Sequence, residues 1–171
     1  WNVEPRLELV FPLVTRRLCP DDAECLYGSG FGLGTLVERR YRSGVGLGVA
    51  YDVRFMSGDN VFELSTLQTV GVSFRYFFRP RSAGHPFVGV EGGAALFGDT
   101  FRVSTGGWYV DGRAGVELEA TDTLSFTLYA IVRALYTASF TSNTDGVRRS
   151  SSGGLDLTLS VGGGLSLRFG P

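Results

Sequence analysis

Apolar and polar residues alternate with a period of two along most of this chain. From Val45 to Phe55 every second residue is apolar, and the residues between are glycine, alanine, aspartate and arginine. A similar alternation runs from Leu155 to Phe169. A helix would spread these apolar residues over all its faces, because its side chains repeat every 3.6 residues. The pattern therefore predicts β-strands.

About eight segments alternate in this way, and no segment reaches the roughly 18 consecutive apolar residues of a transmembrane helix. The segments are Leu7–Leu13, Phe31–Glu38, Val45–Phe55, Thr69–Tyr76, Val88–Leu96, Trp108–Leu118, Leu124–Tyr136 and Leu155–Phe169. Eight is the smallest usual number of strands in a closed membrane barrel. We therefore expect an all-β fold, a closed antiparallel up-and-down transmembrane barrel that takes up residues 1–171 as a single domain.

The predicted connections alternate between two kinds. One set is mostly longer and more polar: Thr15–Ser29, Ser57–Asn60, Phe97–Gly106 and Thr137–Gly153. The other set is made of turns: Arg39–Ser43, Phe78–His85 and Ala120–Thr123. Outer-membrane barrels have long loops outside the cell and short turns on the periplasmic side. This predicts that the first connection lies outside and that His85 lies in a periplasmic turn.

Every mid-strand charge falls on the same face as the glycines and other small residues. The expected lumen charges are Asp52, Arg54, Arg75, Glu91, Asp111, Arg113, Glu117, Arg133, Asp156 and Arg168. A soluble barrel of the lipocalin type would show the same alternation with its apolar face inward. Arginine facing lipid at the midplane costs about 2–4 kcal/mol, and small side chains suit a narrow lumen. The sequence therefore favours the inverted barrel, with the apolar face toward lipid and the charges inside.

With this pattern the whole chain resembles the small outer-membrane barrels of Gram-negative bacteria, of the OmpA-like or OmpX-like type. The most specific match is the end of the last strand, where Gly164, Leu165, Leu167 and Phe169 resemble the signal that the barrel-assembly machinery reads. In that family the chain usually ends at the aromatic residue, whereas here Gly170 and Pro171 follow. The resemblance implies a place in the bacterial outer membrane. The partners that it implies are the outer-membrane lipid, lipopolysaccharide and the barrel-assembly machinery. It also implies that another envelope protein can bind this protein as part of a complex.

The two cysteines, Cys19 and Cys25, enclose a short polar segment that contains a proline. Such a pair suits a disulfide formed in an oxidising compartment. Two alternatives are free thiols and a metal site, although two thiolates without a nearby histidine are a poor zinc set. The chain begins at Trp1, which fits either a mature protein after removal of a signal peptide or a fragment.

Composition excludes several kinds of chemistry. The formal net charge is −1, so the chain lacks the basic field that bulk nucleic-acid binding needs. All 16 basic residues are arginines, which leaves no lysine for a Schiff base or a phosphate loop. The one histidine, His85, is flanked by proline and is expected to be an exposed turn residue. We therefore expect no enzyme, no cofactor and no resident metal.

The lumen charges can be interpreted in two ways: as a satisfied polar plug, or as a salt-bridge gate across a narrow pore. An eight-stranded barrel has room for little more than side chains, which favours the plug. The sequence thus favours a structural anchor or interaction protein. The alternatives are a narrow pore for small solutes or ions and a lipid A-modifying enzyme.

Overall fold

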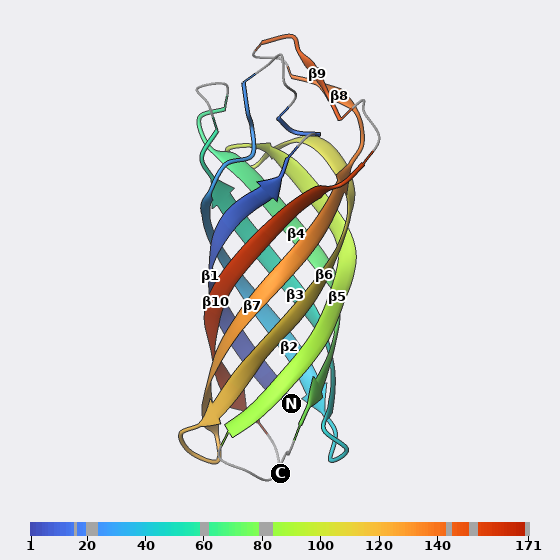
Figure 1. Ribbon diagram of the computed structural model, residues 1–171. Coiled ribbons are helices and arrows are strands. Elements are labelled where there is room, and N and C mark those ends of the chain that lie inside the picture. The colour runs from blue at the N-terminus through green and yellow to red at the C-terminus, as the bar shows by residue number, and fades with distance from the viewer. Residues whose placement is uncertain are drawn as a thin grey trace.

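The computed structural model describes residues 1–15, 17–19, 24–58, 62–78, 84–142, 145–150 and 154–169. Eight antiparallel strands close into a barrel in the order β1-β10-β7-β6-β5-β4-β3-β2 (Figure 1). They are β1 (Asn2–Val14), β2 (Gly30–Arg40), β3 (Val45–Met56), β4 (Ser65–Phe77), β5 (Gly84–Asp99), β6 (Arg102–Glu119), β7 (Leu124–Thr137) and β10 (Asp156–Arg168). A small hairpin, β8 (Phe140–Thr141) and β9 (Arg148–Arg149), lies in the connection between β7 and β10. The predicted fold class is confirmed.

The first and last strands close the barrel. Asn2 of β1 lies opposite Arg168 of β10, and the antiparallel ladder continues from there toward the far end. The pairing extends one residue beyond both strands, because Trp1 and Phe169 exchange backbone hydrogen bonds of 2.9 and 2.8 Å. Both ends of the chain therefore lie at the same end of the barrel (Figure 1). Within the described residues, no helix is long and apolar enough to cross a membrane.

The two faces of the barrel wall have opposite chemistry. Apolar side chains point outward and are widely exposed, as for Val72 (66%), Leu128 (58%) and Val90 (55%). Polar and charged side chains point inward and are buried, in alternation with them. Soluble monomers rarely expose a continuous apolar surface of this extent. The inverted arrangement expected from the sequence is therefore confirmed.

Glycines on the inner face make room for large side chains. Gly71 of β4 lies opposite Gly93 of β5 in the register. A Cβ atom at Gly71 would collide with the hydroxyl group of Tyr109, and one at Gly93 would collide with the backbone of β4. The absence of a side chain at Gly71 makes room for the Tyr109 hydroxyl group, and that at Gly93 allows the close approach of β4 and β5.

One predicted connection is wrong. The segment Phe97–Gly106 is not a long loop, because β5 runs to Asp99 and β6 starts at Arg102. Only Thr100 and Phe101 link the two strands, and both have positive φ angles, 42° and 67°. The strands continue because Phe97, which is 0% exposed, points inward and packs in the core. The longer connections at this end of the barrel are residues 15–29, named loop 1, residues 57–64, and residues 138–155, named loop 4.

Candidate functional site

The middle of the lumen is filled by a charge-balanced group of side chains, here named the central layer. It consists of four arginines and four carboxylates: Arg6, Arg54, Arg113, Arg133, Glu8, Asp52, Glu91 and Asp111. Their side chains are between 0% and 3% exposed. Burying a charge is tolerated only when it is paired and hydrogen-bonded. Each of the eight charges has a partner of opposite sign within 4.0 Å, although neither carboxylate oxygen of Asp52 accepts a hydrogen bond from a described residue.

Glu91 contacts several other side chains of the central layer. Its Oε2 accepts a 2.7 Å hydrogen bond from Arg113 and lies 3.4 Å from Nη1 of Arg6. Its Oε1 accepts a 2.9 Å hydrogen bond from the hydroxyl group of Tyr109. Arg6 also reaches Asp52, at 3.3 Å. Arg6 belongs to β1, and Glu91 to β5, which lies four strands away in the barrel order, so this contact spans the lumen.

Two further pairs complete the central layer. Arg133 donates to Asp111 at 2.6 Å, and its guanidinium lies 4.3 Å from the centre of the Tyr109 ring. Arg54 donates to Glu8 at 2.6 Å. The first pair joins β7 to β6, and the second pair joins β3 to β1 inside the barrel. Together with the contact between Arg6 and Glu91, they place paired charges across the lumen.

A second charged group, the turn-end layer, lies toward the end that carries the termini. Arg75 donates to Glu4 at 2.9 Å and to Glu38 at 2.7 Å. Closer to the opening, Arg40 and Arg168 both donate to Glu117, each at 2.7 Å. The side chains of Arg40 and Arg168 are 18% and 24% exposed, so this layer reaches solvent at its lower edge.

His85 also belongs to the turn-end layer, and the expectation of an exposed turn histidine is wrong. It is the second residue of β5 and is 3% exposed. Its Nε2 lies 3.1 Å from Oε1 of Glu119 on β6. The histidine is buried because β5 begins at Gly84, earlier than the sequence pattern indicates, and this places His85 on the inward face.

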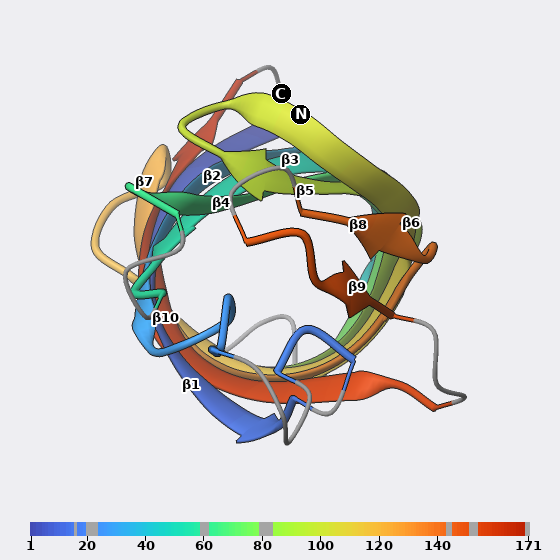
Figure 2. The same cartoon turned by 90° about the horizontal axis from the view of Figure 1, so that it is seen from above.

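The opposite end of the lumen is closed by apolar side chains, here named the apolar cap. Its buried members are Leu18, Leu26, Tyr27, Met56, Phe62, Leu67, Ala95, Phe97, Tyr109 and Leu135. Three of them, Leu18, Leu26 and Tyr27, come from loop 1 and are 0–1% exposed. Burial raises the pKa of Tyr27 to about 12, so its hydroxyl group stays neutral at physiological pH. Loop 1 is thus folded into the mouth of the barrel (Figure 2).

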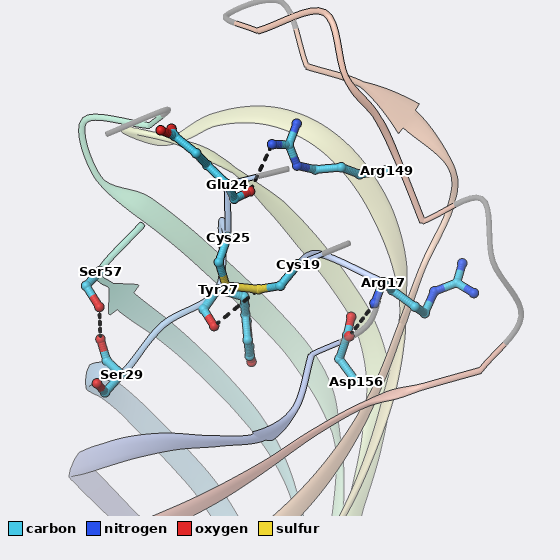
Figure 3. Close-up of a disulfide and its surroundings, with 9 residues drawn as sticks. All are labelled: Arg17, Cys19, Glu24, Cys25, Tyr27, Ser29, Ser57, Arg149 and Asp156. Atoms are coloured by element: carbon cyan, nitrogen blue, oxygen red, sulfur yellow. Dashed lines mark hydrogen bonds between the residues drawn. A yellow bond between two sulfur atoms is a disulfide. The ribbon is translucent and has the colours of Figure 1, made fainter. Parts of the chain in front are cut away.

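The Cys19–Cys25 disulfide closes a small ring within loop 1, and this prediction is confirmed (Figure 3). The ring lies between the cap residues Leu18 and Leu26, whose backbones share a 3.3 Å hydrogen bond. The sulfur of Cys19 lies 3.9 Å from the carbonyl oxygen of Tyr27. The disulfide therefore holds together the two sides of loop 1 that pack into the apolar cap.

Two arginines attach loop 1 to its surroundings. The backbone N–H of Arg17 donates to Asp156 at 2.9 Å (Figure 3). The guanidinium of Arg17 donates to the carbonyl oxygens of Thr137 and Ser150. Arg149 of β9 donates to the carbonyl oxygen of Glu24 at 3.0 Å. Loop 4 therefore holds loop 1 over the lumen.

Removing the disulfide should expose loop 1 to protease. In the double variant Cys19→Ser/Cys25→Ser we expect trypsin to cut after Arg17 about 30- to 150-fold faster, since so short a ring contributes about 2–3 kcal/mol on the chain-entropy model. Timed digestion followed by mass spectrometry measures the rate. Cleavage after Arg148, which is exposed in both proteins, is the internal control. Equal rates after Arg17 would mean that the other contacts alone keep the loop docked.

The structure brings together most of the predicted lumen residues. Asp52, Arg54, Glu91, Asp111, Arg113 and Arg133 lie in the central layer, and Arg75, Glu117 and Arg168 in the turn-end layer. Asp156 belongs to neither layer, since it lies at the mouth of the barrel and accepts a hydrogen bond from the backbone N–H of Arg17. Sequence reasoning missed Glu4 and Arg6, which face the lumen from β1, because the strand was taken to start only at Leu7. Glu8 and Glu38 lie on the polar faces of the predicted strands, but they were not counted among the lumen charges, although both are buried.

The residues proposed as an assembly signal lie on the closing strand β10. Leu167 and Phe169 point outward and are 37% and 55% exposed. Gly164 lies opposite Arg6 of β1, and a Cβ atom there would lie 2.9 Å from Cγ of Glu4. Leu165 is half-buried. Their role in assembly remains a prediction.

Comparison with known proteins gives matches of structure only. No family model and no curated protein sequence matches the chain. The crystal structure of Neisserial surface protein A matches with a TM-score of 0.69 and 13% sequence identity, over 98% of this chain and 96% of that one. The N-terminal β-barrel domain of OprF from Pseudomonas aeruginosa matches with a TM-score of 0.52 and 13% identity, over 97% of each chain. The chain has the fold of the small outer-membrane barrels.

This fold fits both the exposed apolar belt and the filled lumen. Among the residues that the structure describes, no group of three or more histidine, cysteine, aspartate or glutamate side chains is arranged to hold a metal ion. Ion pairs and apolar contacts fill three levels along the barrel axis: the turn-end layer, the central layer and the apolar cap.

Proposed function

We propose that this protein is an integral barrel of the bacterial outer membrane, which acts as a structural anchor or interaction protein and not as a pore. The observation that carries the proposal is the filled lumen. The central layer pairs every one of its charges at 0–3% exposure, and the apolar cap lies above it. An ion entering the lumen would have to break buried ion pairs and then displace packed apolar side chains.

The same arrangement supports a surface role. The described parts of loops 1 and 4 are held to the barrel and to each other by the disulfide, Arg17 and Arg149, so they offer a fixed surface to a partner. A preorganised surface loses less conformational entropy when it binds. We propose no catalytic role, because His85 is buried in the turn-end layer, at the end of the barrel opposite to these loops.

Conductance in a planar lipid bilayer tests whether the lumen is closed. We expect the parent protein to show no steady channels, and Arg113→Ala, which leaves Glu91 and Asp111 short of a partner, to leak ions. Arg148→Ala is the matched control, since this arginine is exposed in loop 4. Steady conductance by the parent protein would support the gated pore instead.

Cysteine labelling of intact cells tests the orientation and the location. Arg148→Cys places a thiol on the exposed part of loop 4, and Thr121→Cys places one on an exposed turn at the other end. We expect a membrane-impermeant maleimide to label position 148 in intact cells and position 121 only after the outer membrane is opened. The reverse pattern would show that the barrel is inserted the other way round.

A further inference from the structure

One carboxylate of the central layer is bonded differently from the other three. Glu8, Glu91 and Asp111 each accept a hydrogen bond of 2.6–2.7 Å from an arginine. Neither oxygen of Asp52 accepts a hydrogen bond from a described residue, although the side chain is only 3% exposed. Burying a carboxylate without hydrogen bonds is unfavourable, because the carboxylate has given up the water that it binds in the unfolded chain. Asp52 therefore needs a donor that the surrounding side chains do not supply directly.

Three guanidinium groups surround Asp52 without hydrogen-bonding to it. Nη2 of Arg6 forms an ion pair with Oδ1 at 3.3 Å, but neither atom has a hydrogen-bond partner among the described residues. Nη2 of Arg54 and Nη2 of Arg133 lie 4.0 and 3.9 Å from Oδ2, beyond the reach of a hydrogen bond. A water molecule that forms two hydrogen bonds of about 2.8 Å holds its two partners about 4–4.5 Å apart. The two longer distances are therefore close to those of a contact bridged by one water molecule.

The buried atoms around Asp52 that lack a hydrogen-bond partner among the described residues include both donors and acceptors. The donors are Nε and Nη2 of Arg6 and Nε and Nη1 of Arg133, and the acceptors are the two oxygens of Asp52 and Oε1 of Glu8. A cation would pair only with the oxygens and would be repelled by the arginines, while chloride would pair only with the N–H groups. Water both donates and accepts hydrogen bonds, so it satisfies both kinds of atom. The chemistry of the site therefore selects water over a monatomic ion.

We propose that Asp52, Arg54 and Arg133 bind one ordered water molecule in the middle of the lumen. The water molecule donates to Oδ2 of Asp52 and accepts from Nη2 of Arg54 and from Nη2 of Arg133. Both nitrogens can donate, because each carries two N–H groups and uses one of them on Glu8 or Asp111. The site thus gives the water molecule three hydrogen bonds, and about three is the usual number for a water molecule buried in a protein.

This water molecule joins opposite walls of the barrel. Asp52 lies on β3 and Arg133 on β7, four strands apart in the barrel order, so the bridge spans the lumen. The direct contact of Arg6 with Glu91 runs from β1 to β5, across the other diameter. The water molecule therefore supplies a second cross-link between facing strands. It is a single bound molecule and not part of a water-filled channel, so the site goes beyond the proposed function and does not depend on it.

A crystal structure at a resolution that shows individual water molecules, from crystals grown in rubidium bromide, tests the site. We expect an electron-density peak within about 3.2 Å of Oδ2 of Asp52 and of Nη2 of Arg54 and Arg133. The peak should give no anomalous signal at the absorption edges of rubidium and bromine. An anomalous signal there would show that an ion occupies the site. A direct hydrogen bond from Arg54 or Arg133 to Asp52, with no water molecule between them, would also overturn the proposal.

Solution NMR of the protein in lipid nanodiscs tests the same site in a bilayer. We expect a cross-peak between water and the guanidinium N–H groups of Arg133, whose opposite signs in NOE and ROE spectra mark a bound molecule and not proton exchange. Asp52→Leu removes both acceptor oxygens and should lose this cross-peak, whereas Asp52→Asn keeps one oxygen and should retain it. Glu63→Ala, at an exposed carboxylate, is the control and should also retain it.

The parent protein alone is enough to refute the site. A cross-peak missing from the parent protein, or one that persists in Asp52→Leu, would overturn the proposal. The crystal structure of the parent protein decides the question if Asp52→Leu does not fold. Conductance tests the closed lumen separately, so a closed barrel without this water molecule would refute this inference alone, and a conducting barrel that holds it would refute only the proposed function.

Discussion

Replacing Glu91 with alanine is expected to destabilise the barrel by about 3–5 kcal/mol, the usual effect of removing one partner from a buried ion pair. Glu91 accepts hydrogen bonds from Arg113 and Tyr109 and lies within ion-pair distance of Arg6 and Arg133. Without it the central layer holds four arginines and three carboxylates. The surplus positive charge stays buried, because these side chains are at most 3% exposed.

Equilibrium unfolding in urea, with the protein in lipid vesicles, measures this difference in free energy. Glu63→Ala is the matched control, since Glu63 is an exposed carboxylate near β4, and its loss should change stability by less than about 0.5 kcal/mol. Glu91→Gln keeps an oxygen that can accept from Tyr109 and should fall between the two. A loss below about 1 kcal/mol in Glu91→Ala would mean that water reaches the central layer.

The strands could be predicted from the sequence because the barrel imposes one rule on every strand. An exposed apolar face outside and a narrow polar lumen inside make the alternation nearly strict, as in Val45–Met56. The prediction failed where this contrast ends. Beyond the apolar belt, Phe97–Gly106 contains Gly98, Asp99 and Gly106, residues typical of turns, and yet these strands continue because Phe97 packs under loop 1.

Which lumen charges meet could not be predicted, because pairing depends on the closure and register of the barrel. Arg6 and Glu91 are 85 residues apart in the sequence and come together only because β1 and β5 lie on opposite sides of the lumen. The apolar cap was missed for a related reason. Leu18 and Leu26 show no alternation, and their burial follows from the disulfide and from the contacts of Arg17 with the far strands.

Placing arginine on the outer face is expected to destabilise the barrel by about 2–4 kcal/mol, because the charge must face hydrocarbon near the midplane. Val72 is the best position, since it lies near the middle of β4 and is 66% exposed. Its side chain makes little contact within the barrel. A lower free energy of unfolding in Val72→Arg therefore measures the cost of placing the charge in lipid, and not a loss of packing inside the barrel. The same urea titration in vesicles measures the effect.

Two control variants separate charge from other effects. Val72→Leu keeps an apolar side chain and should behave like the parent protein, while Ala120→Arg adds the same charge to an exposed position beside a turn and should change stability by less than about 0.5 kcal/mol. A soluble barrel would tolerate Val72→Arg as well as Ala120→Arg, because both side chains would then face water. Equal stability of these two variants would therefore refute the membrane location of the apolar belt, whereas a selective loss in Val72→Arg requires that the belt faces lipid.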